Sequence, residues 1–302
     1  MTGPTDVPEA APRRLESGSF SSGLTVPDFA ACLQMGLRPV GLVQGFCAMQ
    51  WGWYGAGSPY LRGTSPFGFS GGGGGGYMQN WYCPHGFVGG EHRTWGQNYE
   101  QTWVEEAWLS GFNAAFGRMI EEAEEVGAHG VIGVTDTSHN LADMRVAEFH
   151  VLGTAVVVEG APPPPKGLPW STYLAGQRLA KLLEAGFMPI SVVATIASVR
   201  VWAYCITEYL MEGGAYAWGQ SLSSTTEIEQ VSEARLAARA LARDHARRQL
   251  GTDTLQGITF SATEREVGAG DQVVECTLRG TRVRRFKDFD PIPPPRPTVR
   301  LS

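Results

Sequence analysis

Two stretches of the sequence decide the fold, FSSGLTVPDFAACLQMGLRPVGLVQGFCAM (residues 20–49) and WSTYLAGQRLAKLLEAGFMPISVVATIASV (residues 170–199). They align without a gap when residue 20 is placed on residue 170, so that apolar residues, glycines and a proline coincide. A fixed internal offset of this kind is the sequence signature of a repeated structural unit. We therefore predict that the chain consists of two diverged copies of one small unit.

Each copy is predicted to contain a long helix. The segments TWVE (residues 102–105) and TEIE (residues 226–229) both have the pattern of a capping box, in which the Thr and Glu side chains satisfy free N–H groups at a helix start. Each is followed by a helix-length stretch that ends at a glycine, Gly127 or Gly251, the residue expected just past a helix. In the second helix a row of arginines at a spacing of four residues predicts a solvated face, formed by Arg235, Arg239, Arg243 and Arg247.

Runs of β-branched residues predict three strands in each copy. The first copy carries them at residues 39–49, 130–137 and 146–158, and the second at residues 189–199, 255–263 and 273–285. Short helices at 27–35 and 176–185 precede the first strands. The fold class is therefore α+β, with two units that are each a small antiparallel sheet with one long helix. One helix leaves the second face and both edges of such a sheet uncovered, so we expect copies, chains or both to associate.

The domain boundaries follow from this repeat and from composition. We predict disordered tails at residues 1–19 and 287–302, a first unit at 20–159, a proline linker at 160–168 and a second unit at 169–286. An insertion at residues 50–101, rich in glycine and aromatic residues, separates the first strand from the long helix in the first unit.

The segment MIEEAEEVGAHGVIGV (residues 119–134), followed by VLGTAVVV (residues 151–158), resembles the YbjQ-like "putative heavy-metal-binding" family. The second unit resembles the family only as a strongly diverged relative, with Gly251, Gly280 and Thr281 retained. The resemblance implies a dodecin-like fold and assembly into a ring, pentameric in relatives, but no established activity.

The aromatic residues of the insertion are the candidate partner-binding residues. Tyr and Trp are enriched at interface hot spots, which favours a contact surface, although the same side chains could pack onto the sheet of their own unit. The candidates are Trp51, Trp53, Tyr54, Tyr77, Trp81 and Tyr82.

A metal site is the second candidate, formed by Cys83, His85 and His92. Thiolate and imidazole ligands suit zinc or copper. Structural zinc usually needs four ligands and only three are local, so a partly buried thiol beside surface histidines is the alternative.

No residue pattern forces one reaction, and we predict no catalytic residue. A distant alternative, a Cys-dependent enzyme, would require a thiol beside a histidine and a carboxylate, and the spacing of Cys47, His139 and His150 does not show this. Cys47 and His150 are predicted to be structural, and Asp136, Asp143 and Glu148 to be surface groups.

Composition limits the remaining classes. A net charge of −6 does not favour nucleic-acid binding, and no apolar run is long enough for a membrane span. Five scattered cysteines suit a reducing cytoplasm. We therefore expect a cytoplasmic, non-enzymatic, ring-forming homo-oligomer that acts as a scaffold or binds a protein partner. The alternative is a metal- or small-ligand-binding protein that uses Cys83, His85 and His92 or the crevices between subunits.

Overall fold

The structure is a computed structural model that describes residues 21–50, 98–141, 146–162, 169–201, 227–266 and 272–287. The helices in these ranges are α2 (Val26–Gln34), α3 (Thr102–Glu125), α4 (Gly176–Glu184) and α6 (Glu229–Leu250). The strands are β1 (Leu37–Gln50), β2 (Asn98–Glu100), β3 (Gly130–Leu141), β4 (Val146–Val158), β5 (Trp170–Ser171), β6 (Phe187–Val201), β7 (Thr254–Glu266) and β8 (Gln272–Arg285).

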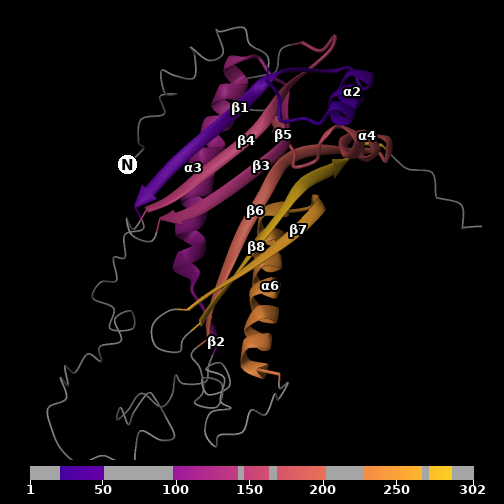
Figure 1. Cartoon of the computed structure of the whole chain (residues 1–302). Helices are drawn as coiled ribbons and strands as arrows, with labels where there is room; N and C mark the ends of the chain where they lie inside the picture. Colours follow the sequence, from indigo (N-terminus) through magenta and orange to yellow (C-terminus); the bar gives the residue numbers. More distant parts are fainter. Residues whose placement is uncertain are drawn as a thin grey trace, which may run out of the picture.

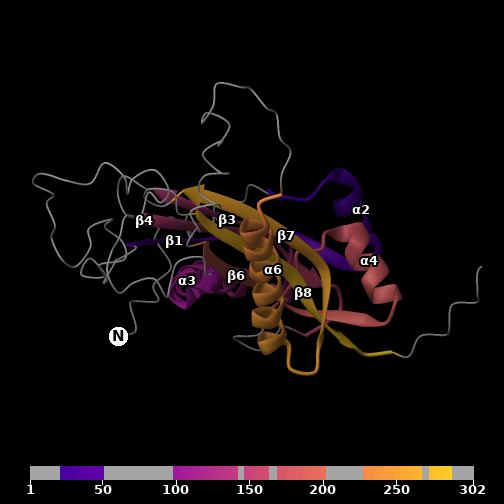
Figure 2. The same cartoon turned by 90° about the horizontal axis from the view of Figure 1, so that it is seen from below.

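The strands form two four-stranded sheets, which confirms the α+β class (Figure 1). The first sheet has the order β1-β4-β3-β5 and the second has the order β2-β6-β8-β7. The long helix α3 lies against β1 and β4, while α6 lies against β6 and β8 (Figure 2). Among the helices in the described ranges, none is long and apolar enough to cross a membrane.

The two sheets share their irregularities as well as their strand order. The β1–β4 register shifts after Pro39, and the β6–β8 register shifts after Pro189. The third strand is irregular at Gly133 in one sheet and at Gly257 in the other, and both glycines have a positive φ. These matches support the predicted duplication. Below, residues at the same register position of the two halves, 21–162 and 169–287, are called counterparts.

The glycines predicted to end the short helices do so. Gly36 follows α2 with a φ of 73°, and Gly186 follows α4 with a φ of 77°. Residues that have a Cβ rarely adopt such backbone angles. Gly127 and Gly251 likewise have positive φ at the ends of the long helices.

The predicted capping box of the first long helix is wrong. The N-cap of α3 is Gln101, and Thr102 is already the first helical residue. The Gln101 N–H donates to the Ser198 carbonyl (2.8 Å), and the Ser198 hydroxyl donates to Gln101 Oε1 (3.0 Å). The helix start is therefore held by a strand of the other half. The N-cap of α6 is Ile228, which makes no side-chain capping bond, and Thr226 lies outside the described residues.

Three clusters of buried side chains make up the core. The first lies between α3 and the first sheet, and the second lies between α6 and the second sheet. The third joins the halves beside the short helices and includes Cys32, Ile132, Leu174 and Leu179. In both views α2 and α4, one from each half, lie side by side (Figures 1 and 2).

Candidate functional site at the junction of the two halves

The halves exchange short strands at their junction. The strand β5, at the start of the second half, pairs in parallel with the outer edge of β3 in the first half. Its backbone bonds continue beyond the strand: Thr172 N–H donates to the Val131 carbonyl (2.9 Å), and Gly133 N–H donates to the Leu174 carbonyl (3.1 Å). The second half thus supplies the fourth strand of the first sheet.

The first half supplies the fourth strand of the second sheet in return. The strand β2, which leads into α3, pairs antiparallel with the end of β6. The side-chain amide of Asn98 donates to the Gln230 carbonyl of α6 (2.9 Å). Because each half completes the sheet of the other, the junction is an integral part of both sheets.

Apolar packing follows the same exchange. Alternate residues of β6 enter different cores: Val193, Ala197 and Val199 belong to the cluster under α6, while Val192 and Ile196 belong to the cluster around α3. The strand is therefore buried on both faces. The helix α3 is in contact with both sheets, through β1 and β4 of the first and β6 of the second.

A buried polar group crosses the junction beside this core. Arg279 of β8 forms a bidentate ion pair with Asp136 of β3, with Nη2 and Oδ2 2.7 Å apart. The Tyr173 hydroxyl donates to Asp136 Oδ1 (2.9 Å). Burial, and next the charge of Asp136, raise the pKa of Tyr173 well above its usual range. The expectation that Asp136 is a surface group is wrong, since its side chain is 3% exposed: an arginine and a tyrosine of the other half cover it.

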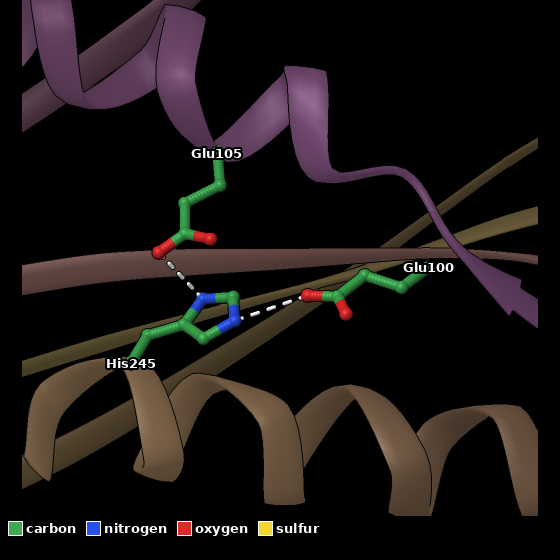
Figure 3. A group of neighbouring side chains, drawn as sticks. All are labelled: Glu100, Glu105 and His245. Atoms are coloured by element: carbon green, nitrogen blue, oxygen red, sulfur yellow. Dashed lines mark ion pairs between the residues drawn. The ribbon is translucent and has the colours of Figure 1, made fainter. Parts of the chain in front are cut away.

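A second polar group, shown in Figure 3, lies where β2 runs into α3. His245 of α6 is buried, with Nε2 3.0 Å from Glu100 Oε1 and Nδ1 2.8 Å from Glu105 Oε1. Nδ1 also lies 3.1 Å from the Ile196 carbonyl oxygen. Burial raises the pKa of Glu105, and attraction to His245 and Arg248 opposes that rise. The carboxylates come from the first half and the imidazole from the second, so the group links the halves.

Within the described residues these three side chains are candidate ligands for a heavy metal. Their ligand atoms lie within 4.8 Å of one another. However, the two carboxylates face different nitrogens of one ring, and an imidazole binds an ion through a single nitrogen. One ion could therefore meet only His245 and one glutamate, whereas zinc sites use three or four protein ligands. The group fits an imidazole held between two carboxylates better than it fits a zinc or copper site.

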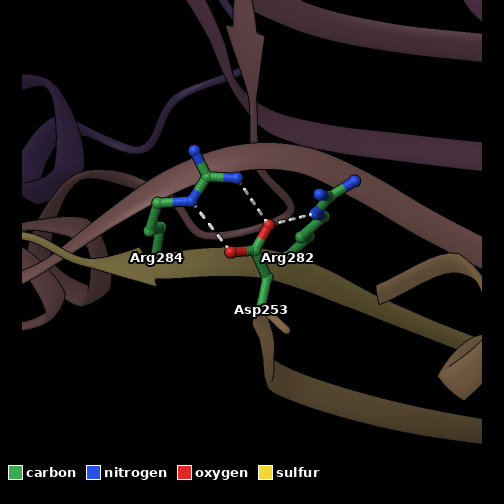
Figure 4. A network of polar contacts seen from close by, with 3 residues as sticks. All are labelled: Asp253, Arg282 and Arg284. Atoms are coloured by element: carbon green, nitrogen blue, oxygen red, sulfur yellow. Dashed lines mark hydrogen bonds and ion pairs between the residues drawn. The ribbon is translucent and has the colours of Figure 1, made fainter. Parts of the chain in front are cut away.

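A third polar group lies within the second half, at the turn between α6 and β7 (Figure 4). Asp253 accepts hydrogen bonds from Arg282 Nε (2.6 Å) and from Arg284 Nε (2.9 Å) and Nη2 (3.0 Å). These bonds, that of Arg284 first, lower the pKa of Asp253 to about 2. The group fixes the residue that leads into the outer strand of the second sheet.

The predicted site residues of the insertion lie outside the described residues. These are the metal candidates Cys83, His85 and His92 and the partner-binding candidates Trp51, Trp53, Tyr54, Tyr77, Trp81 and Tyr82. Both predictions stay predictions.

Other predicted residues are described. Cys47 is a buried core residue, as expected, and burial raises the pKa of its thiol. His150 is half-exposed and packs on the Phe46 ring, with centroids 4.6 Å apart. His139 is exposed on β3.

The arginine row of α6 is exposed, as expected for a solvated face. Arg239 and Arg243 lie over the Phe260 ring, 5.1 and 5.3 Å from its centroid. Arg235 pairs with Glu264, and Arg247 pairs with Asp244.

Sequence reasoning missed the exchanged strands and both polar groups of the junction. The strands β2 and β5 have three and two residues, too short for an alternation of apolar and polar residues to be visible. One signal was available. The row Val192, Ala194 and Ile196 on β6 is as apolar as the opposite face of the same strand, which is typical of a strand buried on both sides.

Two comparisons with known proteins give matches. Residues 85–159 match the model of the YbjQ-like family described as "Putative heavy-metal-binding", which confirms the predicted family for this segment. Over 187 residues the chain is 28% identical to the "Encapsulin nanocompartment protein Rv1762c" of Mycobacterium tuberculosis (strain ATCC 25618 / H37Rv), and the alignment covers 60% of this chain and 67% of that protein. No solved structure matches the chain. Membership of the second half in the family stays a prediction.

Proposed function

We propose that this chain, whose residues 85–159 are YbjQ-like, is a non-enzymatic structural protein that assembles with copies of itself into a closed ring. The observation that carries the proposal is the exchange of strands at the junction. Each sheet has one edge completed by the other half and one edge, β1 or β7, that no further strand covers in the described part of the chain. Open edges of this kind are places where another chain can add.

The junction inside the chain is heterologous, because the two halves contribute different surfaces to it. Repetition of a heterologous contact between chains gives a closed ring or an open filament. In this proposal the second half of one chain meets the first half of the next, so the two kinds of half alternate around one ring. The related protein is named for an encapsulin nanocompartment, which also supports a role in assembly.

The number of chains in solution tests this function. Native mass spectrometry of the purified protein at micromolar concentration is expected to give one defined oligomer of several chains. Light scattering at the same concentration checks the mass without transfer to the gas phase. A strictly monomeric chain in both measurements would contradict the proposal.

A role in heavy-metal binding is the second candidate, and only the family description supports it. Within the described residues the group around His245 does not fit such an ion, which leaves Cys83, His85 and His92 as its candidate ligands. We expect less than one tightly bound metal per chain by elemental analysis. Stoichiometric zinc or copper that disappears in the Cys83→Ser/His85→Ala variant would establish this role instead.

A further inference from the structure

The open edge of β7 has a specific occupant. We propose that residues Ser22–Leu24 of a second copy of this chain add to β7, just as residues Thr172–Leu174 add to β3 within the chain. This inference rests on the proposed self-assembly and names the surfaces that carry it.

The donor segment Ser22–Leu24 is already held in place by its own half. Within the second half, Tyr173 N–H donates to the Thr281 hydroxyl (3.1 Å), and the Leu174 side chain lies against Gly257. The first half repeats both contacts. Gly23 N–H donates to the Thr154 hydroxyl (3.1 Å), and Leu24 lies against Gly133.

The anchored segment Thr172–Leu174 uses its backbone to bond the sheet of the other half. The segment Ser22–Leu24 is anchored in the same way, and no strand of its own chain pairs with it in the ranges that the structure describes. A segment held in its binding conformation loses little conformational entropy on association. It is therefore suited to extend a sheet of a second copy.

The acceptor edge of β7 has backbone groups at the same register positions as the edge of β3 that is already occupied. Three backbone groups of β3 bond the added segment: the Val131 carbonyl and the N–H groups of Gly133 and Val134. Their counterparts on β7, the outermost strand of its sheet, are the Leu255 carbonyl and the N–H groups of Gly257 and Ile258.

The incoming Ser22 N–H would donate to the Leu255 carbonyl, and its carbonyl would accept from Ile258 N–H. The Leu24 carbonyl would accept from Gly257 N–H. Addition of a strand to an open edge by backbone bonds is a general mode of recognition.

Apolar surface is exposed on both open edge strands, β1 and β7. Ile258 on β7 is 49% exposed, whereas its counterpart Val134, in the core cluster around α3, is 2% exposed. Phe46 on β1 is 43% exposed, whereas its counterpart Ile196, packed around α3, is 5% exposed. Removal of apolar surface from water favours association. The contact that covers Ile196 within one chain would cover Phe46 between two chains, and a segment added to β7 would lie beside Ile258.

The two contacts are not chemically identical. Asp136 and Arg279, which pair inside the chain, have Phe260 and Leu152 as counterparts, so the contact between chains lacks this ion pair. Thr254 stands where Gly130 lies under the Trp170 ring. The predicted contact is therefore limited to the backbone hydrogen bonds of Ser22–Leu24, and the residues before Ser22 are not part of it.

Paired proline variants test the register. Ser22→Pro removes the N–H that would bond the second copy, because proline has no backbone N–H. Ser21→Pro is the matched control. Its counterpart Ser171 lies between Trp170 and Thr172, which donate to the His129 and Val131 carbonyls, and alternate N–H groups of an added strand face away from the edge. We expect native mass spectrometry to show that Ser22→Pro lowers the oligomeric fraction at least tenfold and that Ser21→Pro changes it less than twofold.

The outcomes separate this inference from the proposed function. A wild-type protein that is monomeric overturns both. A wild-type oligomer that Ser22→Pro leaves intact, or that the two proline variants weaken equally, overturns this inference alone.

A cross-link gives a second measurement that does not depend on loss of assembly. Ser171 pairs with Val131 in the chain, so Ser21 of one copy is expected opposite Leu255 of the next. The Ser21→Cys/Leu255→Cys variant is expected to give disulfide-linked multimers on a non-reducing gel. Each single variant shows the contribution of the native cysteines, and Ser21→Cys/Thr263→Cys is the control with a mismatched register. Equal cross-linking of the matched and mismatched pairs would overturn the register.

Discussion

The strands β1 and β6 hold counterpart positions in the two sheets, and their surroundings differ. Both lie under the long helix of their half and pair with the last strand of that half, but β1 is the edge of its sheet whereas β6 lies inside its sheet. From Val192 to Val201 every residue of β6 is buried, whereas β1 alternates, with Val43 and Cys47 buried and Phe46 exposed. The difference comes from what lies on the second face: α3 covers β6, and no described element covers that face of β1.

This difference teaches that burial of a strand depends on its neighbours as well as its sequence. The second face of β1 presents Leu42, Phe46 and Ala48 with one polar residue, Gln44, and so is not a typical solvated face. This mostly apolar face is covered in the second half and open in the first. Such a difference is expected when a heterologous contact forms once within the chain and its second acceptor surface is left for another chain.

The largest expected effect on stability is the difference between the same substitution on β6 and on β1. Ile196→Asp places a carboxylate among the apolar side chains that pack on the covered face of β6 and is expected to lower the free energy of unfolding by about 4 kcal/mol. Phe46→Asp makes the same change on the open face and is expected to cost less than about 1 kcal/mol. Urea unfolding in a Ser22→Pro background measures both with assembly weakened.

The two variants are expected to rank in the opposite order when the oligomeric fraction is measured by native mass spectrometry. Phe46→Asp is expected to reduce the oligomeric fraction, because it charges the surface that a second chain would cover. Equal losses of unfolding free energy in the two variants would contradict the assignment of β1 as the open face.

The next effect concerns the ion pair that only the internal contact has. Arg279→Leu leaves Asp136 as an uncompensated buried charge and is expected to cost about 3 kcal/mol. The double variant Asp136→Asn/Arg279→Leu removes both charges while Asn still accepts from Tyr173, and it is expected to cost about half as much. Urea unfolding of the single and double variants measures the difference. A double variant that is less stable than Arg279→Leu would contradict this account.

A smaller effect is expected at the group around His245. His245→Gln removes an imidazole whose two nitrogens face carboxylates and is expected to lower the free energy of unfolding by about 2 kcal/mol at pH 7. Burial raises the pKa of Glu105 in the folded protein, so the folded state binds a proton at higher pH than the unfolded state. The loss should therefore shrink as the pH falls from 7 to 5.

Chemical unfolding at both pH values measures this change. The double variant His245→Gln/Glu105→Gln is the control, since it no longer has the titrating carboxyl. A loss that is the same at pH 7 and pH 5 in the single variant would show that packing, and not charge, is responsible.

Much of the fold could be predicted from the sequence because both halves have the same sequence signals at corresponding positions. Glycines with positive φ end the short and long helices in each half, and the predicted strands are within a few residues of those observed. The repeat made each prediction twice, which compensated for weak local patterns.

The junction could not be predicted, because its parts are short or ordinary when read along the chain. Asp136 has the sequence context of a surface acid, and Arg279 lies 143 residues further on. His245 sits in a helix full of arginines, and its partners come from the other half. Only the three-dimensional arrangement of the halves brings these residues together. The metal and partner-binding residues predicted in the insertion remain predictions.

The smallest expected effect lies at the turn before β7, where the halves differ once more. Asp253 accepts bonds from Arg284 and Arg282, whereas its counterpart His129 faces backbone groups of its own half. Asp253→Asn is expected to lower Tm by about 2 °C at pH 6, since the bonds to the arginines lose their charge. The exposed pair of Glu264 and Arg235 gives the control, and Glu264→Gln is expected to leave Tm unchanged.

The pH dependence of the Asp253 variant has a definite sign. The pKa of this carboxyl is lowered to about 2 in the folded protein, below its unfolded value of about 3.9. Its stabilising contribution is therefore complete above pH 5 and is lost as the pH falls toward 2. Thermal melts of the wild type and Asp253→Asn are expected to converge over that range. A difference in Tm that persists at pH 2 would mean that the shape of the side chain, and not its charge, holds the turn that leads into the open edge.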